Sequence, residues 1–300
     1  MTMRTLAECF VLCGCGVLLG FVTMLMMFAN VNTPLSSTSQ TINNISISPE
    51  SVNVGLIDAT RAVVMIRLNG YGSGGSGTII GRTKVDEDTW RYKILTAHHV
   101  IDSILDGIHG ATPESNLSAI RSITIGNRDG FHQPIRLFDT ALNETDWSVP
   151  SQDWAIFSCD IDAKLHFAVL GTREEFNAVL PYENVYGVGA DRMRGIFIRD
   201  GFISSTNCVE PFHIDPTSKA PWDVNPELFF RPFHIIHFGA SGGPIFSKNG
   251  KIIGLYNAVG VEQTSPFTVE ELKGMAIALK TFTVQEMLSN TNSKITTVEN

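Results

Sequence analysis

From residue 58 onward, apolar residues occur in many short runs that are separated by Gly, Asn and Asp turns. These runs are rich in β-branched residues, which favour strands. They lie at 62–68, 78–81, 92–96, 123–125, 154–158, 185–188, 195–204, 244–247 and 251–257. Helical periodicity is scarce until 283–289, where Val284, Met287 and Leu288 share one helical face. The pattern predicts an all-β domain that ends in a short helix.

The N-terminal part has a different pattern, because residues 9–29 are apolar and carry no charge. A helix of this length spans a hydrocarbon core of roughly 30 Å, so a transmembrane anchor is predicted. Two alternatives stay open: a signal peptide cleaved after Ala29, and lipidation in the lipobox-like sequence around Cys13. Arg4 is the only basic residue near the segment before Arg61. The positive-inside rule therefore places the N-terminus inside and the following chain outside the cytoplasm.

These patterns divide the chain into five parts. A short tail (1–8) precedes the anchor or signal segment (9–29). Residues 30–57 are rich in Ser, Thr and Asn, which predicts a solvated linker. One folded domain is predicted over 58–290, and 291–300 form a C-terminal tail.

The composition argues against nucleic acid as a partner. The chain has 22 basic and 30 acidic residues, a formal net charge of −8, whereas binding phosphate requires basic patches. Five cysteines are too few for a disulfide framework in 300 residues, and three of them lie in the apolar N-terminal segment. Cys159 and Cys208 remain, either bridged or as two small buried thiols.

A nucleotide cofactor and a metal are not expected. Residues 72–77 match G-x-G-x-x-G, but a dinucleotide site needs a helix directly afterwards. The apolar run 78–81 that follows is a predicted strand closed by glycine. His98 and His99 are adjacent and diverge in direction, so they do not suggest a shared metal.

Three short segments carry candidate chemistry. His98 and His99 follow a predicted strand, Asp153 begins another, and Ser241 lies in the turn Gly-Ala-Ser-Gly-Gly-Pro. A serine hydroxyl needs an adjacent base, histidine has a suitable pKa of about 6.5, and a buried carboxylate orients the imidazole. The order His, Asp, Ser is that of the chymotrypsin arrangement. Asp146 is a rival acid, but no apolar strand follows it.

The same segments resemble the trypsin-like serine peptidases, especially HtrA/Deg-type and compact bacterial or viral members. Residues 96–100 (TAHHV) are similar to the family's T-A-A-H-V, 153–156 to its D-x-A-[LIV], and 239–244 to its G-x-S-G-G-P. Weaker similarities at 75–80, 201–204 and 274–278 extend the resemblance over roughly residues 60 to 290.

The resemblance implies two six-stranded antiparallel β-barrels with a short C-terminal helix, preceded here by the transmembrane helix. It also implies a catalytic triad of His99, Asp153 and Ser241, and an oxyanion hole formed by the N–H groups of Gly239 and Ser241. Ala240 replaces the aspartate of trypsinogen-type enzymes, so their zymogen switch is not expected. Nothing resembling a PDZ domain follows the last helix.

The implied activity is that of a serine endopeptidase, which cleaves protein or peptide substrates through an acyl-enzyme and needs no cofactor or metal. A catalytically silent binding module on the same fold and an esterase are the alternatives. Silent relatives usually lose a triad residue or the oxyanion glycines, and this chain keeps them all. The natural substrate and the oligomeric state are left open by the sequence.

Four residues occupy positions that frame the family's primary specificity pocket: Ile235, Tyr256, Asn257 and Gly274. A preference for Lys or Arg requires a carboxylate at the pocket floor, because a buried cation without a partner is costly. Ile235 supplies none, so we expect small to medium apolar side chains to be preferred. His234 and His237 leave a preference for acidic residues as an alternative.

Overall fold

The computed structural model describes residues 54–69, 74–112, 115–130, 132–208, 225, 227–265 and 268–296, and for 259–265, 268–275 and 291–296 only the backbone. The predicted N-terminal tail, the anchor or signal segment 9–29 and the linker up to residue 53 lie outside the described residues. Within the part of the chain that the structure describes, no helix is long and apolar enough to cross a membrane.

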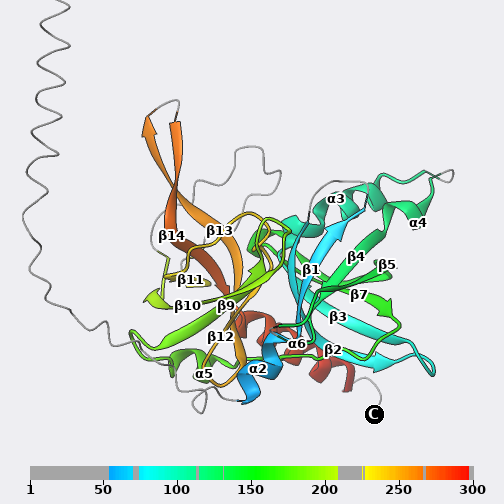
Figure 1. The fold of residues 1–300 in the computed structure, drawn as a ribbon, viewed down its shortest axis with the longest axis horizontal. Coiled ribbons are helices and arrows are strands. Elements are labelled where there is room, and N and C mark those ends of the chain that lie inside the picture. Colours follow the sequence, from blue (N-terminus) through cyan, green and yellow to red (C-terminus); the bar gives the residue numbers. More distant parts are fainter. Residues whose placement is uncertain are drawn as a thin grey trace, which may run out of the picture. The chain divides into compact units, whose positions relative to one another are not determined.

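Strands dominate the described chain, as the sequence predicts (Figure 1). The strands are β1 (Val63–Leu68), β2 (Gly74–Lys84), β3 (Trp90–Thr96), β4 (Ser122–Asn127), β5 (Arg136–Ala141), β6 (Glu144–Val149), β7 (Trp154–Ile161), β8 (Val169–Leu170), β9 (Asn184–Ala190), β10 (Ile196–Ser205), β11 (Phe229–Pro232), β12 (Pro244–Phe246), β13 (Lys251–Ser265) and β14 (Thr268–Lys280). The helices are α2 (Val54–Thr60), α3 (His98–His109), α4 (Leu117–Ile120), α5 (Arg173–Asn177) and α6 (Phe282–Thr296), with a 3-10 turn at Pro150–Gln152.

The first sheet contains seven antiparallel strands in the order β5-β4-β1-β2-β3-β7-β6. Its interior strand β1 pairs with β2 and β4, and five of its six side chains are buried. Burial on both faces is explained by curling of the sheet, whose β5 edge approaches β7. Thr140 Oγ1 on β5 donates a hydrogen bond to the carbonyl oxygen of Asp160 on β7 at 2.8 Å.

The second sheet closes on itself, because β12 pairs with both β9 and β13. The closed ring is β12-β9-β10-β11-β14-β13, and β8 pairs with β13 in parallel outside it. Figure 1 shows that β13 and β14 continue together beyond the other strands of this ring.

Each half thus contains seven strands, where two six-stranded antiparallel barrels were predicted. The additional strands have weak sequence signals. β6 carries the acidic residues Glu144 and Asp146 and shows no apolar run, and β8 has only two residues. The closed six-stranded ring of the second half confirms the barrel prediction there.

One core cluster joins the two sheets, because Ile66 on β1, Val188 on β9 and Phe246 on β12 are all buried within it. A second cluster lies within the second barrel, where the Phe176 ring packs edge-on against Phe230 and Phe282 at centroid distances of 5.2 and 5.6 Å. Phe282 begins α6, so these aromatic pairs attach the predicted C-terminal helix to the barrel; such pairs contribute about 0.5–1.5 kcal/mol each beyond area burial.

Three local expectations need correction. α3 is a twelve-residue helix in a region where no helix was predicted, although its apolar residues Val100, Ile101 and Ile104 follow the helical period and are buried. Helix α2 begins within the predicted linker, because Leu56 packs into the core. Cys159 and Cys208 are both free and buried, so the bridged alternative is wrong. Burial raises the pKa of the Cys159 thiol to about 12.

Candidate active site

Asp153 is held at the start of β7 in an unusual backbone conformation. It directly follows the 3-10 turn Pro150–Gln152 and adopts the left-handed region, with φ 53° and ψ 50°. Its N–H donates to the carbonyl oxygen of Pro150 at 3.1 Å. A non-glycine residue in this region carries strain of about 1–3 kcal/mol and is typically found where the surroundings require a defined side-chain direction. Here the carboxylate is directed into the protein and only 1% exposed.

The Asp153 carboxylate binds His99 at two points. Its Oδ2 lies 2.8 Å from His99 Nδ1, and its Oδ1 accepts the backbone N–H of His99 at 2.9 Å. His99 belongs to the first turn of α3, whose N-cap residue Ala97 has no side chain to satisfy the exposed N–H groups. Asp153 therefore supplies the negative charge favoured at a helix N-terminus and orients the imidazole with the same two oxygens.

The imidazole of His99 has a defined tautomer. An ionised carboxylate only accepts hydrogen bonds, so Nδ1 carries the proton and Nε2 the lone pair. Burial disfavours the charged ring, but the hydrogen bond that Nδ1–H donates to Asp153 and the charge of this carboxylate outweigh burial, and the pKa of His99 is raised. The side chain is still 38% exposed. A ring in this tautomer can accept a proton at Nε2.

The other candidates at these positions occupy different environments. Burial lowers the pKa of His98. Asp153 binds His99, the second histidine of the pair. Asp146, the rival acid, lies on β6 and forms an ion pair with Lys93 at 3.5 Å. The structure brings together His99 and Asp153, the two residues selected from the sequence.

Asn257 completes the surroundings of the carboxylate. Its Nδ2 donates to Asp153 Oδ2 at 3.0 Å and to the Asp153 carbonyl oxygen at 2.7 Å. Its Oδ1 accepts the N–H of Leu279 at 3.0 Å, and the residue is 3% exposed. Sequence reasoning placed Asn257 at the specificity pocket and missed this contact. Its amide is instead committed to Asp153 and to β14.

Ser241 lies in a turn that two glycines make possible. Gly239 has φ +94°, and a Cβ there would lie 2.6 Å from the carbonyl oxygen of Ala190. Gly242 has φ +80°, and a Cβ there would collide with Ser76 and Thr96. Both positions require glycine for torsion and for space. The close approach also packs the serine turn against the strand end that leads to the histidines.

The backbone of the turn leaves two donors available. The N–H of Ala240 donates to the carbonyl oxygen of His237 at 3.0 Å, and the N–H of Gly242 donates to the carbonyl oxygen of Tyr256 at 2.8 Å. Among the hydrogen bonds of the described residues, neither Gly239 N–H nor Ser241 N–H has an acceptor. Backbone N–H groups are rarely left without one, so this pair marks a place where a ligand oxygen can bind.

Gly75 lies between the serine turn and helix α3. A Cβ at Gly75 would lie 2.8 Å from the Ser241 carbonyl oxygen and 2.6 Å from a methyl group of Val100, the residue after His99. Among the described residues, the Ser241 hydroxyl has no hydrogen-bond partner. Catalytic hydrogen bonds are often long without substrate.

Comparison with known proteins identifies the family of the chain. A sequence model described as a trypsin-like peptidase domain matches residues 75–255, which is more than half of the chain. The chain belongs to the trypsin-like peptidase family. The match begins at the glycine between Val100 and Ser241 and ends on β13, so it includes all three residues of the predicted triad.

None of the curated proteins compared with this peptidase matches its sequence. Among solved structures, it is similar to the HtrA-type protease AlgW with tripeptide, at 19% identity and a TM-score of 0.49 over 78% of this chain and 61% of that chain. It is also similar to Rv3671c from M. tuberculosis H37Rv, at 17% identity and a TM-score of 0.49. This match covers 82% of this chain and 94% of that chain. The chain spans less than two thirds of the length of AlgW.

The residues predicted for the peptidase's specificity pocket have different exposures. Ile235 is 57% exposed and lies just before the serine turn. Tyr256 and Asn257 on β13 are buried and turned toward internal partners. Gly274 lies on β14, where only the backbone is described.

His234 is buried and uses both ring nitrogens. Its Nδ1 lies 2.6 Å from the hydroxyl of Tyr256, and its Nε2 lies 3.2 Å from the carbonyl oxygen of Val185. Since a carbonyl only accepts, Nε2 donates to Val185 and Nδ1 accepts from Tyr256. Burial lowers the pKa of His234 to about 4. His234 is thus neutral at ordinary pH and supplies no cation for an acidic substrate residue.

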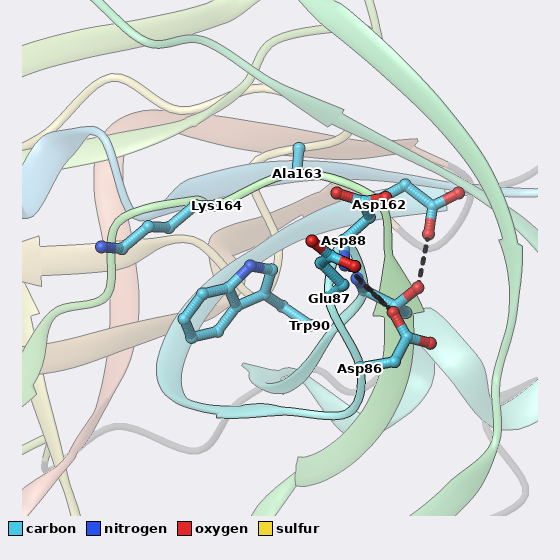
Figure 2. Close-up of a pocket in the computed structure, with 8 residues that line it drawn as sticks. Asp86, Glu87, Asp88, Trp90, Asp162, Ala163 and Lys164 are labelled. Carbon is cyan, nitrogen blue, oxygen red and sulfur yellow. Dashed lines mark hydrogen bonds between the residues drawn. The ribbon is translucent and has the colours of Figure 1, made fainter.

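An acidic pocket lies elsewhere on the peptidase, at the turn between β2 and β3 (Figure 2). Asp86 Oδ1 accepts the N–H of Thr89 at 2.9 Å, and Asp162 accepts the Thr89 hydroxyl at 3.0 Å. These carboxylates stabilise the turn, and none of the predicted site residues lines the pocket. Within the described residues, no cluster of His, Cys, Asp and Glu is suited to hold a metal.

Proposed function

We propose that this protein is a serine endopeptidase with His99, Asp153 and Ser241 as its catalytic triad. The observation that carries the proposal is the 2.8 Å contact between His99 Nδ1 and Asp153 Oδ2. This contact leaves the lone pair of His99 on Nε2. The serine turn, which is packed beside the histidine segment, contributes the hydroxyl that such a base activates.

The proposed reaction has two stages. Ser241 Oγ attacks the substrate carbonyl carbon while His99 Nε2 takes its proton, and His99 then returns this proton to the leaving amine. A water molecule, deprotonated by the same nitrogen, hydrolyses the acyl-enzyme and releases Ser241. Asp153 stays ionised throughout and stabilises the imidazolium that forms in each stage.

The N–H groups of Gly239 and Ser241 are proposed to form the oxyanion hole. Both lack acceptors among the described residues, and the intervening Ala240 N–H is already bonded to His237. Negative charge develops on the substrate carbonyl oxygen only in the transition state, so these donors act there. Loss of one such donor typically costs about 2.7–4 kcal/mol.

For the substrate we propose a small to medium apolar side chain before the scissile bond. Ile235 brings no carboxylate to the position that selects Lys or Arg in trypsin-like enzymes. The buried, neutral His234 brings no cation that would select an acid. Apolar pockets discriminate by only about 1–3 kcal/mol per methylene, so we expect the preference to be broad.

The activity is tested with a fluorophosphonate probe and a peptide library on the full chain in detergent. We expect covalent labelling at Ser241 and cleavage after apolar residues. A protein that folds but is not labelled would be a silent binding module. Turnover of esters without any turnover of peptides would instead identify an esterase, and dominant cleavage after Lys or Arg would refute the pocket assignment.

We also propose that residues 9–29 anchor the enzyme in a membrane, with the peptidase domain on the non-cytoplasmic side. The support is the uncharged apolar sequence of this segment. Resistance to carbonate extraction and retention of an N-terminal tag are expected. A variant with residues 9–29 deleted is the control and should appear in the soluble fraction. A mature N-terminus at Asn30 would contradict the anchor and favour a signal peptide.

A further inference from the structure

Ser76 is a polar side chain in a buried position between the two sheets. It lies on β2 and is 0% exposed. Its hydroxyl donates to the carbonyl oxygen of Gly239 at 2.6 Å and accepts the N–H of Ala190 at 2.7 Å. One hydroxyl thereby connects the serine turn to the end of β9. The reaction proposed above does not use this group.

The backbone of Ser76 makes two further contacts with the same region. Its N–H donates to the carbonyl oxygen of Ser241 at 2.8 Å, and its carbonyl oxygen accepts the Thr96 hydroxyl at 2.7 Å. Thr96 is also buried and ends the strand that precedes the histidines. Ser76 therefore contacts the turn on both sides of Ala240, and Thr96 fixes Ser76 in turn.

These contacts bear on the turn that carries both proposed oxyanion donors. A glycine allows its flanking peptide planes to rotate at little steric cost, so each plane must be fixed by hydrogen bonds. The peptide that carries the Gly239 N–H is fixed by Arg192, whose N–H donates to the carbonyl oxygen of Phe238 at 2.7 Å. The next peptide links the two donors: its carbonyl oxygen, that of Gly239, accepts the Ser76 hydroxyl, and its N–H, that of Ala240, donates to the carbonyl oxygen of His237. Without the Ser76 hydroxyl, the peptide that links the two donors loses its side-chain anchor.

We propose that Ser76 is a positioning residue that holds the Gly239–Ser241 turn so that its two N–H donors face the substrate carbonyl, and that Thr96 holds Ser76 in place. This inference rests on the proposed serine peptidase function and extends it by one residue. Ser76 touches no reacting atom and acts through the peptide between Gly239 and Ala240. Its removal should weaken interactions with a developing oxyanion and leave ground-state binding of the substrate unchanged.

The test compares a peptide aldehyde with the corresponding peptide alcohol, both ending in an apolar residue. The aldehyde forms a hemiacetal with the catalytic serine and places an oxygen in the oxyanion hole, whereas the alcohol does not. In Ser76→Ala we expect aldehyde affinity to fall by about 10- to 100-fold, because a group displaced by about 1 Å can cost roughly 100-fold. Affinity for the alcohol should stay within about twofold, and kcat should fall while KM changes little.

Thr281→Val is the matched control, since the Thr281 hydroxyl is equally buried and donates to the carbonyl oxygen of Ile252 at 2.7 Å, away from the serine turn. It should lose stability without losing preference for the aldehyde.

If Ser76→Ala does not fold, Thr96→Val provides a second test. It removes the hydroxyl that donates to the Ser76 carbonyl oxygen and should also weaken aldehyde binding. Unchanged aldehyde affinity in a folded variant would overturn the role of Ser76. A wild-type protein that does not distinguish aldehyde from alcohol would overturn the proposed function itself.

Discussion

Asn257 holds Asp153 from the opposite sheet, because its Nδ2 donates to the Asp153 carbonyl oxygen at 2.7 Å and to Oδ2 at 3.0 Å. Asp153 directly precedes β7 in the first sheet, whereas Asn257 lies on β13 in the second. The same amide that fixes the carboxylate also supports its strained backbone. The two halves of the fold are thus joined at the residue that orients His99.

Asn257→Ala should lower both stability and activity. It removes one hydrogen bond from Asp153 Oδ2 and leaves the Asp153 carbonyl oxygen and the Leu279 N–H without their partner, which typically costs about 1–3 kcal/mol of unfolding free energy. A carboxylate displaced by about 1 Å should reduce kcat by roughly 100-fold. Urea unfolding and kcat per titrated active site measure the two effects.

Asn127→Ala is the control for that substitution. Asn127 is also buried and donates two hydrogen bonds to backbone carbonyls, those of Arg61 and Val63. It should lose comparable stability and keep its kcat. If both variants lose kcat equally, the role of Asn257 is only to maintain the fold.

The two adjacent histidines should differ sharply on substitution. His99→Ala removes the group bound to Asp153, and we expect kcat to fall by about 10⁴-fold or more. His98→Ala removes a half-buried ring with no hydrogen bond to Asp153 and should have a mild effect. Steady-state kinetics on both variants checks this, and equal losses would mean that the base is wrongly assigned.

Activity should fall on acidification with the titration of His99. Only the neutral ring accepts the serine proton, and its contact with Asp153 raises its pKa above the ordinary value of about 6.5. The acid limb of kcat/KM should therefore have its midpoint above pH 6.5. A raised pKa contributes stability below the unfolded-state pKa, and this contribution disappears as pH rises through the folded-state pKa. A midpoint near pH 4 in a stably folded enzyme would point to a different base.

His234 should make the fold acid-sensitive. Its pKa is lowered by burial to about 4, so its contribution to stability is present above pH 6.5 and disappears as pH falls toward 4. The difference between the pKa of 6.5 in the unfolded chain and about 4 in the folded protein corresponds to about 3 kcal/mol of unfolding free energy. Urea unfolding at a series of pH values should show this loss in the wild type and a smaller one in His234→Gln. An identical slope in the wild type and His234→Gln would contradict the assignment of this loss to His234.

The sequence predicted the strands with strong apolar runs, the C-terminal helix and the segments that meet at the site. It did not predict β5, β6, β8 and β11. Two exposed or acidic edge strands and two strands of two and four residues leave little periodic signal. Helix α3 had a visible period in Val100, Ile101 and Ile104, which the strand pattern around it obscured.

The supporting contacts were harder to foresee. Ser76 and Asn257 act through partners about 160 and 100 residues away, and no local pattern encodes such pairing. Each of the two polar residues lies next to a predicted strand: Ser76 comes shortly before 78–81, and Asn257 is the last residue of 251–257. A polar residue at such a place is the one signal that could have drawn attention to them.

The most direct test of the whole account is peptide cleavage by Ser241→Ala, measured beside its thermal unfolding. The hydroxyl has no hydrogen-bond partner among the described residues, so its removal should leave the unfolding temperature nearly unchanged. Cleavage and fluorophosphonate labelling should both disappear. A folded Ser241→Ala protein that still cleaves peptides at the wild-type rate would contradict the assignment of Ser241 as the nucleophile.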